Sequence, residues 1–349
     1  MSLLTVCINT RNRKEFLEAT LNSILGQDSG DYDVFVVDGA STDGTDQLLE
    51  EYSRLHRNFG YFISRDFISL DEGYELVVQK AQGDYCWLMS DDDLIKPGSI
   101  NRIVNLIRKR NCELILLNID CYTQDLSLDL HQKLIPREED CFYGKEQKGQ
   151  FLADIGFALG YLGCIVMKRE VWFSVDRQPF IGTYFVPAGV ILKTNEILSV
   201  YYLSDPEILY RSGNQSWTAR SFEIWYFKWP RLIWGFTQYP ESVREAITPA
   251  EPWHRFLTVL KSRAMGEFTL AIYKQHLRKS LSVSERLSLF PLLFVPVIFF
   301  NTALVIGCAL FRRKGLYTMY NLMMSSPWRG FTRFVLKCFG INFPPALPR

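Results

Sequence analysis

Three consecutive aspartates, Asp91, Asp92 and Asp93, are the residues of this 349-residue chain best suited to chemistry. They follow an apolar, aromatic run, Tyr85–Met89, which the pattern predicts to be a buried strand. Adjacent carboxylates repel one another, so the triplet becomes reasonable when a cation lies among them. Hard divalent cations such as Mg²⁺ or Mn²⁺ take oxygen ligands and bridge to phosphate oxygens. The triplet therefore predicts a metal site, with an acidic turn that caps the next helix through Asp93 or Ser99 as the alternative.

Polar residues also follow two earlier predicted strands, over residues 4–10 and 32–38. Helical patterns over residues 15–26 and 46–57 give a strand–helix–strand–helix order. In open α/β sheets, ligands bind at the carboxyl ends of the strands. Asp38 is therefore suited to bond a ribose or base, while Thr10, Arg11 and Arg13 are suited to hold a nucleotide edge or phosphate. No Gly-x-Gly-x-x-Gly motif or P-loop is present, so neither a dinucleotide fold nor an NTPase is indicated.

Taken in order and spacing, these motifs resemble the family 2 glycosyltransferases. The resemblance covers the first 115 residues or so and is carried by Asn-Thr-Arg-Asn-Arg at 9–13, Val-Asp-Gly-Ala-Ser-Thr-Asp-Gly-Thr at 37–45, Gly-Asp-Tyr at 83–85 and Ser-Asp-Asp-Asp at 90–93. Looser motifs at 161–172, 180–183 and 211–217 are similar to those of abequosyltransferase-like enzymes of bacterial O-antigen assembly. The resemblance implies a GT-A fold, which is a nucleotide-binding α/β sheet flanked by helices, and a nucleotide-diphosphate sugar as the donor.

Carried over position by position, the resemblance implies two sets of site residues. Those expected to bind the nucleotide sugar are Thr10, Arg11, Arg13, Asp38, Asp71, Asp91, Asp92, Arg211, Asn214 and Ser216. Asp93 is the expected direct ligand of Mg²⁺ or Mn²⁺, together with Asp91. One small departure is that Gly39 and Ala40 replace the usual second Asp and Gly after the second strand.

A larger departure concerns the general base. Inverting relatives usually supply a carboxylate after the metal motif, but the comparable stretch here, residues 183–189, contains no carboxylate and no His. A general base has to reach the acceptor hydroxyl. Asp154, Asp176, Glu196 and Asp205 are all available and none stands out, so both the base and the stereochemical outcome are unassigned.

The charge and cysteine content of the chain indicate which binding partners and which cell compartment to expect. The net charge of +1 indicates no nucleic-acid partner, but from residue 253 onward the chain carries 14 Lys and Arg against 2 Asp and Glu. Such a basic part is expected to meet an anionic surface, here membrane lipids. Eight scattered Cys without a Cys-x-x-Cys motif favour a reducing compartment over a disulfide framework. The first six residues are expected to belong to a strand and not to a secretion signal.

The basic part contains a run of 23 residues without a charge, residues 289–311, flanked by Arg286 and by basic residues 312–314. Its length suits a bilayer. However, Pro291, Pro296 and Asn301 interrupt it, and a single span would place a basic tail outside the cell. We therefore expect a bent, re-entrant or in-plane insertion at the cytoplasmic face of the bacterial inner membrane, with a buried core helix as the alternative.

Two aromatic stretches belong with this run. Residues 222–239 suit a membrane interface or a polyprenyl-lipid groove, with ordinary helical core packing as the alternative. Residues 316–343 are predicted to form one amphipathic interfacial helix. Residues 114–119 are predicted to form a further strand, and residues 127–149 a polar loop near the acceptor.

These observations predict three parts: a catalytic domain over residues 1–215, an aromatic helical connector over 216–285 and a membrane-associating region over 286–349. The predicted function is metal-dependent transfer of a sugar, possible examples being 3,6-dideoxyhexoses such as abequose, to a polyprenyl-diphosphate-linked saccharide in O-antigen or surface polysaccharide assembly. The alternatives are a soluble or protein acceptor, and a catalytically silent sugar- or membrane-binding scaffold.

Overall fold

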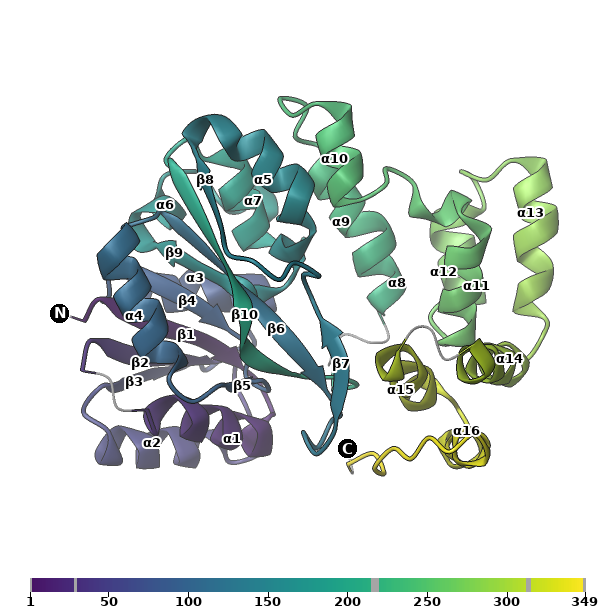
Figure 1. The fold of residues 1–349 in the computed structure, drawn as a ribbon, viewed down its shortest axis with the longest axis horizontal. Coiled ribbons are helices and arrows are strands. Elements are labelled where there is room, and N and C mark those ends of the chain that lie inside the picture. Colours follow the sequence, from purple (N-terminus) through teal and green to yellow (C-terminus); the bar gives the residue numbers. More distant parts are fainter. Residues whose placement is uncertain (1, 28–29, 215–219, 312–314, 348–349) are drawn as a thin grey trace. The chain divides into compact units, whose positions relative to one another are not determined.

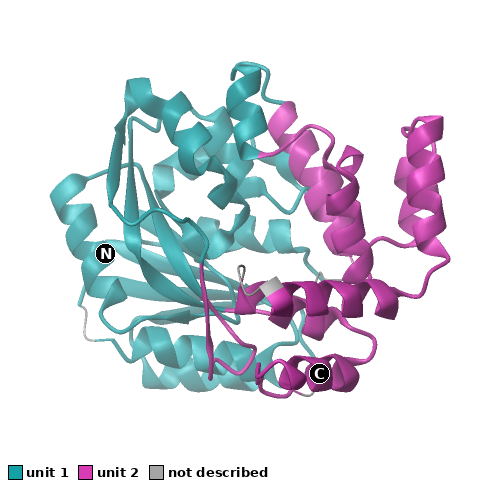
Figure 2. Ribbon diagram, turned by 45° about the vertical axis from the view of Figure 1, so that its right-hand side comes forward, with its two compact units in different colours: residues 1–120, 133–210, 235–247 teal, residues 121–132, 211–234, 248–349 magenta. Residues whose placement is uncertain are grey.

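The computed structural model describes residues 2–27, 30–214, 220–311 and 315–347. The chain forms two compact units, shown in different colours in Figure 2. Unit 1 comprises residues 1–120, 133–210 and 235–247, and unit 2 comprises residues 121–132, 211–234 and 248–349. The chain thus passes between the units at five points in sequence. The predicted division into three functional parts has other bounds and stays a prediction.

The main sheet has ten strands in the order β3-β2-β1-β4-β9-β6-β10-β5, with β7 paired to β6 and β8 paired to β10. The strands are β1 (Leu4–Thr10), β2 (Tyr32–Asp38), β3 (Phe59–Ile63), β4 (Tyr85–Met89), β5 (Leu94–Ile95), β6 (Leu114–Tyr122), β7 (Asp129–Lys133), β8 (Cys141–Gly144), β9 (Ile165–Lys168) and β10 (Ser199–Arg211). Strands β1 to β4 run parallel, whereas β9 runs antiparallel to both β4 and β6. The predicted strands over residues 4–10, 32–38, 85–89 and 114–119 are confirmed.

Among the described residues, four helices accompany strands β1 to β5 in unit 1: α1 (Lys14–Leu25), α2 (Thr45–Leu55), α3 (Leu70–Lys80) and α4 (Ser99–Arg110). Helices α1 and α2 lie side by side (Figure 1). Helix α3 starts with a capping box, in which Ser69 and Glu72 satisfy each other's backbone amides. It packs on β1 and β2, and Gly73 permits the approach, because a Cβ there would lie 2.1 Å from Oδ1 of Asn9.

The strands that follow β6 in sequence correct one prediction. Residues 127–149 are not a loop, because they contain β7 and β8 and run into α5 (Lys148–Ile155). Strand β7 has a polar sequence with low strand propensity, and it forms because the edge of β6 offers backbone partners. Helices α6 (Arg169–Phe173), α7 (Val186–Lys193) and α10 (Glu241–Ile247) complete the unit. Helix α10 packs against α5.

Unit 2 is helical apart from its short share of the strands. Its helices are α8 (Ser221–Glu223), a π-helical turn (Ile224–Lys228), α9 (Trp229–Trp234), α11 (Phe256–Ala264), α12 (Leu270–Ile272), α13 (Val283–Leu289), α14 (Val297–Phe311), α15 (Leu316–Ser325) and α16 (Arg329–Cys338). Of the two interpretations of residues 222–239, core packing is confirmed: Phe222, Trp229 and Phe236 are buried and the other aromatic side chains of the stretch are half-buried.

The uncharged run is bent, as the sequence predicts. Among the described residues no single helix combines the length and apolar composition of a membrane span, and only the pair Val283–Leu293 and Val297–Leu310, bent by 95°, has them together. The break lies at Pro296, whereas Asn301 sits inside α14 and does not interrupt it. The single helix predicted for residues 316–343 is wrong, because α15 and α16 are separated by a turn that contains Pro327.

Candidate active site

The carboxyl ends of β1, β2 and β4 bring the predicted residues of unit 1 to one edge of the sheet. Thr10 and Asp38 are direct partners in the β1–β2 register, and Ile8 pairs with Met89 in the β1–β4 register. Asp91 therefore follows β4 at the level where β1 ends. The backbone pairing of these parallel strands is therefore enough to place three polar loops at one edge of the sheet.

Arg13, just before α1, joins the first loop to the aspartate triplet. Its Nε lies 3.0 Å from Oδ1 of Asp91, and its Nη2 pairs with Asp92. Thr10 donates its hydroxyl to Oδ2 of Asp91 over 2.8 Å. Burial raises the pKa of Asp91 to about 6; Arg13 opposes this rise and Asp92 adds to it. The guanidinium thus supplies a cation between two of the three carboxylates.

Asp93 has a different environment from its two neighbours. Its carboxylate is buried and accepts a hydrogen bond of 2.6 Å from the Ser90 hydroxyl, while its carbonyl oxygen accepts one of 2.9 Å from Thr20. The alternative that Asp93 or Ser99 caps the next helix is wrong, because the residue before α4 is Gly98, in a left-handed conformation. The triplet therefore has no capping role at α4.

Asp38, at the end of β2, is buried and organises the loop that follows it. Its Oδ1 accepts hydrogen bonds from both the backbone amide of Ser41, over 3.2 Å, and the Ser41 hydroxyl. Burial raises the pKa of Asp38, whereas the bonds from Ser41 lower it, and burial prevails. Ala40 adopts a φ of +66°, which explains why glycine is usual at this position in the family.

Asn12 and Ser41 belong to the site although the sequence assigned them no role. The backbone amide of Asn12 donates to the Ser41 hydroxyl over 2.8 Å, and Asn12 Oδ1 accepts from the amide of Thr42 over 2.7 Å. These bonds hold the loops after β1 and β2 together. The available signal was that Asn12 lies within a polar run between two arginines. Arg11 is exposed, with its guanidinium 4.5 Å from the centre of the Phe67 ring.

Asp71, in the first turn of α3, is buried and bonded to a distant loop. Its Oδ2 accepts from the backbone amides of Gly182, over 2.7 Å, and Tyr184, over 2.9 Å. Both residues have positive φ, +87° and +75°, so this loop is held in a conformation that L-residues rarely adopt. The loop is part of the stretch in which inverting relatives usually supply the general base.

Arg211 and Asn214 lie in unit 2 and are bonded to Gln124. Arg211 is buried and donates to the Gln124 carbonyl over 2.6 Å, and the Gln124 side chain donates to Oδ1 of Asn214 over 3.4 Å. The backbone amide of Gln124 donates to the Tyr320 hydroxyl, and the side-chain Oε1 of Gln124 accepts from the backbone amide of Leu347. Ser216, the third predicted residue of this group, lies outside the described residues.

The four acidic residues considered for the base are not brought together. Asp154 accepts from Arg137 and Tyr143, Asp176 accepts from the backbone amide of Gln178, and Glu196 and Asp205 are exposed. None of the hydrogen bonds or ion pairs found for the described residues joins one of them to the aspartate triplet. The general base remains unassigned.

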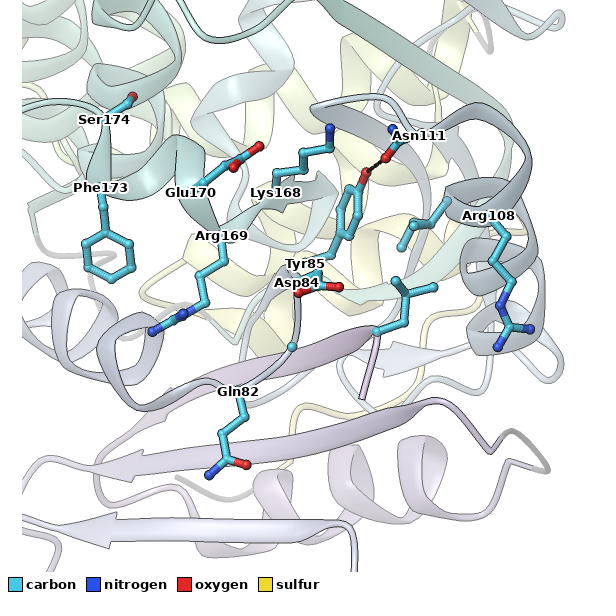
Figure 3. Close-up of a pocket in the computed structure, with 13 residues that line it drawn as sticks. Gln82, Asp84, Tyr85, Arg108, Asn111, Lys168, Arg169, Glu170, Phe173 and Ser174 are labelled. Atoms are coloured by element: carbon cyan, nitrogen blue, oxygen red, sulfur yellow. Dashed lines mark hydrogen bonds between the residues drawn. The ribbon is translucent and has the colours of Figure 1, made fainter. Parts of the chain in front are cut away.

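A cavity of about 720 Å³ lies at the other end of β4, lined by Gln82, Gly83, Asp84 and Tyr85, among others. In Figure 3 the Tyr85 hydroxyl reaches Asn111, to which it donates over 3.2 Å. Tyr85 begins β4 and Asp91 follows its end, so about 20 Å of strand separates the cavity from the aspartates. Its Lys168 is paired with Glu113. The cavity is therefore separate from the site described above.

Comparison with known proteins finds a family model that matches the first half of the chain and several similar bacterial proteins. Residues 5–172 match the family model for "Glycosyl transferase family 2". The chain is 28% identical over 277 residues to abequosyltransferase RfbV of Salmonella typhimurium, which covers 72% of this chain and 81% of that protein. It is 23% identical over 254 residues to the putative teichuronic acid biosynthesis glycosyltransferase TuaG of Bacillus subtilis, covering 69% of this chain and 95% of the relative.

The fold is shared with solved structures. A crystal structure of residues 1–349 of S. aureus TarS gives a TM-score of 0.55 at 14% identity, covering 95% of this chain and 92% of that one. The same TarS fragment in complex with UDP-GlcNAc gives a TM-score of 0.52. With the mixed sheet and the strand-end motifs described above, these structural matches confirm the predicted GT-A fold. The family-model match over residues 5–172 confirms the predicted enzyme class, a glycosyltransferase. Residues 5–172 of the chain thus form a family 2 glycosyltransferase domain.

Proposed function

We propose that this glycosyltransferase binds a nucleotide-diphosphate sugar at the carboxyl ends of β1, β2 and β4 and transfers the sugar to a lipid-linked saccharide. The observation that carries the donor site is the convergence of Thr10, Arg13, Asp38 and the aspartate triplet on one sheet edge. Buried, hydrogen-bonded polar groups at strand ends are what a polar ligand requires. The solved complex of TarS with UDP-GlcNAc, a protein of the same fold, supports a nucleotide sugar as the ligand class.

Within this site, Asp38 is the proposed acceptor for the base or ribose. Its Oδ1 is engaged by Ser41, which fixes the carboxylate in one orientation. Arg11 and Phe67 form an exposed cation–aromatic pair in unit 1, and such planar groups suit stacking against a base. Thr10 and Arg13 keep Asp91 and Asp92 in place, which makes their contribution to nucleotide binding one of positioning.

A divalent cation, Mg²⁺ or Mn²⁺, fits this site with Asp93 as the ligand from the protein. Both oxygens of Asp91 are engaged by Arg13 and Thr10, so we propose Asp93 alone where the sequence also suggested Asp91. The described residues contain no group of three or more His, Cys, Asp or Glu arranged to hold a metal. Magnesium-type sites commonly complete their shell with phosphate oxygens and water. When bound, the cation would stabilise negative charge on the departing diphosphate.

The other part of the reaction is the attack of an acceptor hydroxyl on the anomeric carbon. Asp71 acts here as a positioning residue, because it holds the backbone of residues 182–184 in a strained conformation. The proposed roles of Arg211, Asn214 and Ser216 at the diphosphate, and that of Asp71 in lining the nucleotide pocket, stay predictions.

The acceptor is proposed from the named relatives and from the surface of unit 2. RfbV is named for abequose transfer and TuaG for teichuronic acid biosynthesis, and both names point to bacterial surface polysaccharides. A 3,6-dideoxyhexose such as abequose is accordingly the first donor sugar to test. Thirteen large apolar side chains are exposed among the described residues of unit 2. Exposed apolar surface of this extent suits a lipid-borne acceptor at the cytoplasmic face of the inner membrane.

The donor site is tested by calorimetry with UDP, GDP, CDP and dTDP. Asp38→Ala should weaken binding of the preferred nucleotide at least tenfold, even in chelator, because the contact is to base or ribose. Asp33→Ala, nearer the amino end of the same strand, is the matched control and should bind normally. Unchanged affinity in Asp38→Ala would remove Asp38 from the site. Failure of the wild-type protein to bind any of the four nucleotides would overturn the donor proposal.

A further inference from the structure

The bend between α13 and α14 presents aromatic side chains to solvent. We call residues 290–299 the bend tip. Phe294 is 72% exposed and Phe299 is 65% exposed, and Phe290 and Val295 are also exposed. The tip carries no charged residue, and the nearest charge before it is Arg286. Large apolar side chains exposed together on a soluble surface are costly, so an apolar partner is expected.

Arg263, on α11, holds the tip from behind. It is buried, and its guanidinium donates to the carbonyls of Leu292 over 3.0 Å, Leu293 over 3.2 Å and Val295 over 2.8 Å. It also donates to the carbonyl of Phe268 over 3.1 Å. The carbonyls near the end of a helical segment lack hydrogen-bond donors within that segment, and the Arg263 guanidinium provides those donors. Burial lowers the pKa of Arg263, but a guanidinium stays charged at physiological pH.

Helix α14 is also fixed to the protein along one face. Asn301 is fully buried and donates to the carbonyls of Ala264 and Leu322. Val305, one turn further, is buried as well, whereas Phe299 and Leu310 are exposed. The 15 residues of α14 span about 22 Å, which is less than the 30 Å or so of a hydrocarbon core. The helix therefore has one apolar face available and is too short to cross.

We propose that the bend tip inserts into the acyl region of a single membrane leaflet and that the Arg263 clamp keeps the pair bent, so that both arms stay on one side. The occupant of this surface is an anionic bilayer, because exposed cations lie on the segment that leads to the tip. They are Lys274, Arg278, Lys279 and Arg286. This inference rests on the membrane association proposed above, and specifies how it occurs.

The insertion is tested by flotation of full-length protein with vesicles of phosphatidylethanolamine and phosphatidylglycerol. Phe294→Glu and Phe299→Glu should each lower the bound fraction at least tenfold, since a charge would have to enter the acyl region. Leu55→Glu replaces a side chain that is 67% exposed at the end of α2 in unit 1, and should bind like the wild type. If both tip variants bind the vesicles as well as the wild type does, the inference about the tip is overturned, while the membrane proposal stands. A wild-type protein that does not float would overturn the membrane proposal itself.

Sidedness is tested with an impermeant maleimide on sealed vesicles. Cys338, exposed on α16, reports one arm, and Leu287→Cys, on the exposed surface of α13, reports the other. Insertion into one leaflet predicts that both are labelled from the cytoplasmic side and that neither is labelled from the opposite side. Labelled peptides are identified by mass, which separates them from the other cysteines. Labelling from opposite sides would show a crossing and overturn the inference.

The clamp is tested by hydrogen exchange. Arg263→Gln should speed amide exchange across the bend tip at least tenfold and leave β1 unchanged, and Arg57→Gln, at an exposed arginine after α2 in unit 1, should leave both unchanged. Arg263→Lys keeps the charge but loses the planar fork that reaches several carbonyls, so it should also speed exchange at the tip. Wild-type exchange at the tip in Arg263→Lys and Arg263→Gln would show that the clamp does not hold the bend.

Discussion

The two units differ in which residues they bury and which they expose. Unit 1 buries its charges: Asp38, Asp71 and Asp93 are each less than a tenth exposed and each is hydrogen-bonded. Unit 2 exposes its apolar residues, since it holds thirteen of the nineteen exposed large apolar side chains among the described residues although it is the smaller unit. A buried charge and an exposed phenylalanine each cost free energy in the unbound protein, and binding of a partner at such a site offsets that cost.

The two units arrange these residues by different means. In unit 1 the polar groups are positioned by strand register, which fixes the backbone from which each side chain extends. In unit 2 the apolar surface is shaped by helix ends and by a bend that one arginine holds. Substitutions should therefore separate the two functions, and four predictions test this separation.

The largest effect is expected at Asp93. Asp93→Asn keeps the shape of the side chain and removes a hard anionic ligand, so sugar transfer should fall by about 100-fold to 1000-fold. Binding to anionic vesicles should not change, because unit 2 is untouched. Transfer of radiolabelled sugar from the nucleotide donor measures the first quantity, and flotation the second.

Asp84→Asn is the matched control, since Asp84 is exposed at the opposite end of β4. It should transfer at the wild-type rate. Near-normal transfer by Asp93→Asn in buffer treated with chelator would show that the carboxylate does not hold a metal.

The second prediction tests the same separation of functions with substitutions in unit 2. Phe331 and Phe334 lie on the exposed face of α16, opposite the buried Thr332 and Leu336. The double variant Phe331→Glu/Phe334→Glu should lower vesicle binding about tenfold, because each side chain loses part of a burial energy of about 2 kcal/mol. Transfer to a short soluble acceptor should stay constant while transfer to a lipid-linked acceptor falls. If both transfers fell equally, the two units would not be separable in this way.

The third prediction concerns packing at the site edge. Gly73→Ala places a Cβ 2.1 Å from Oδ1 of Asn9 on β1, so the Asn9 side chain or helix α3 has to shift. The free energy of unfolding should fall by about 1–3 kcal/mol. Gly149→Ala, in α5, meets nothing within 4 Å and should be neutral or stabilising by up to about 1 kcal/mol. Denaturant unfolding of both variants measures the difference, and equal stabilities would mean that α3 can move away from β1 at little cost.

The smallest effect is expected at His254 in unit 2, which contacts Glu285 and lies 3.0 Å from Glu251. The bond to Glu285 raises the pKa of His254 above its ordinary 6.5. The stability that the protonated ring contributes is fully present below the ordinary value, and is lost as pH rises through the raised value. The wild type should therefore lose slightly more thermal stability than His254→Gln between pH 6 and pH 8. Parallel melting curves for the two proteins would contradict this.

The sequence predicted the first half of unit 1 well because its signals are local. Buried strands end in polar residues and amphipathic patterns mark the first two helices, so β1, β2 and β4 and the loops after them could be placed in order. It failed at residues 127–149, where β7 and β8 depend on the edges of β6 and β10 and not on their own propensity.

Two contacts, one at the candidate site and one at the bend tip, could not be predicted for a similar reason. Asp71 is separated by 111 residues in sequence from the amide of Gly182, and nothing in either motif indicates the other. Arg263 reads as one more basic residue of a helix, and only the fold shows that it faces the carbonyls of a bend. Contacts between a side chain and distant backbone groups leave no pattern of residue types.

The five passages of the chain between the units govern the order in which the protein can be completed during synthesis. Helix α10, which packs on α5 in unit 1, follows residues 211–234 of unit 2 in the chain. The ribosome therefore delivers part of unit 2 before unit 1 has its last helix, and then delivers the remainder of unit 2. Neither unit can be finished as an isolated nascent domain. Exchange of a whole C-terminal half between relatives would divide both units, so new acceptor specificities are better sought by substitution within the intact chain.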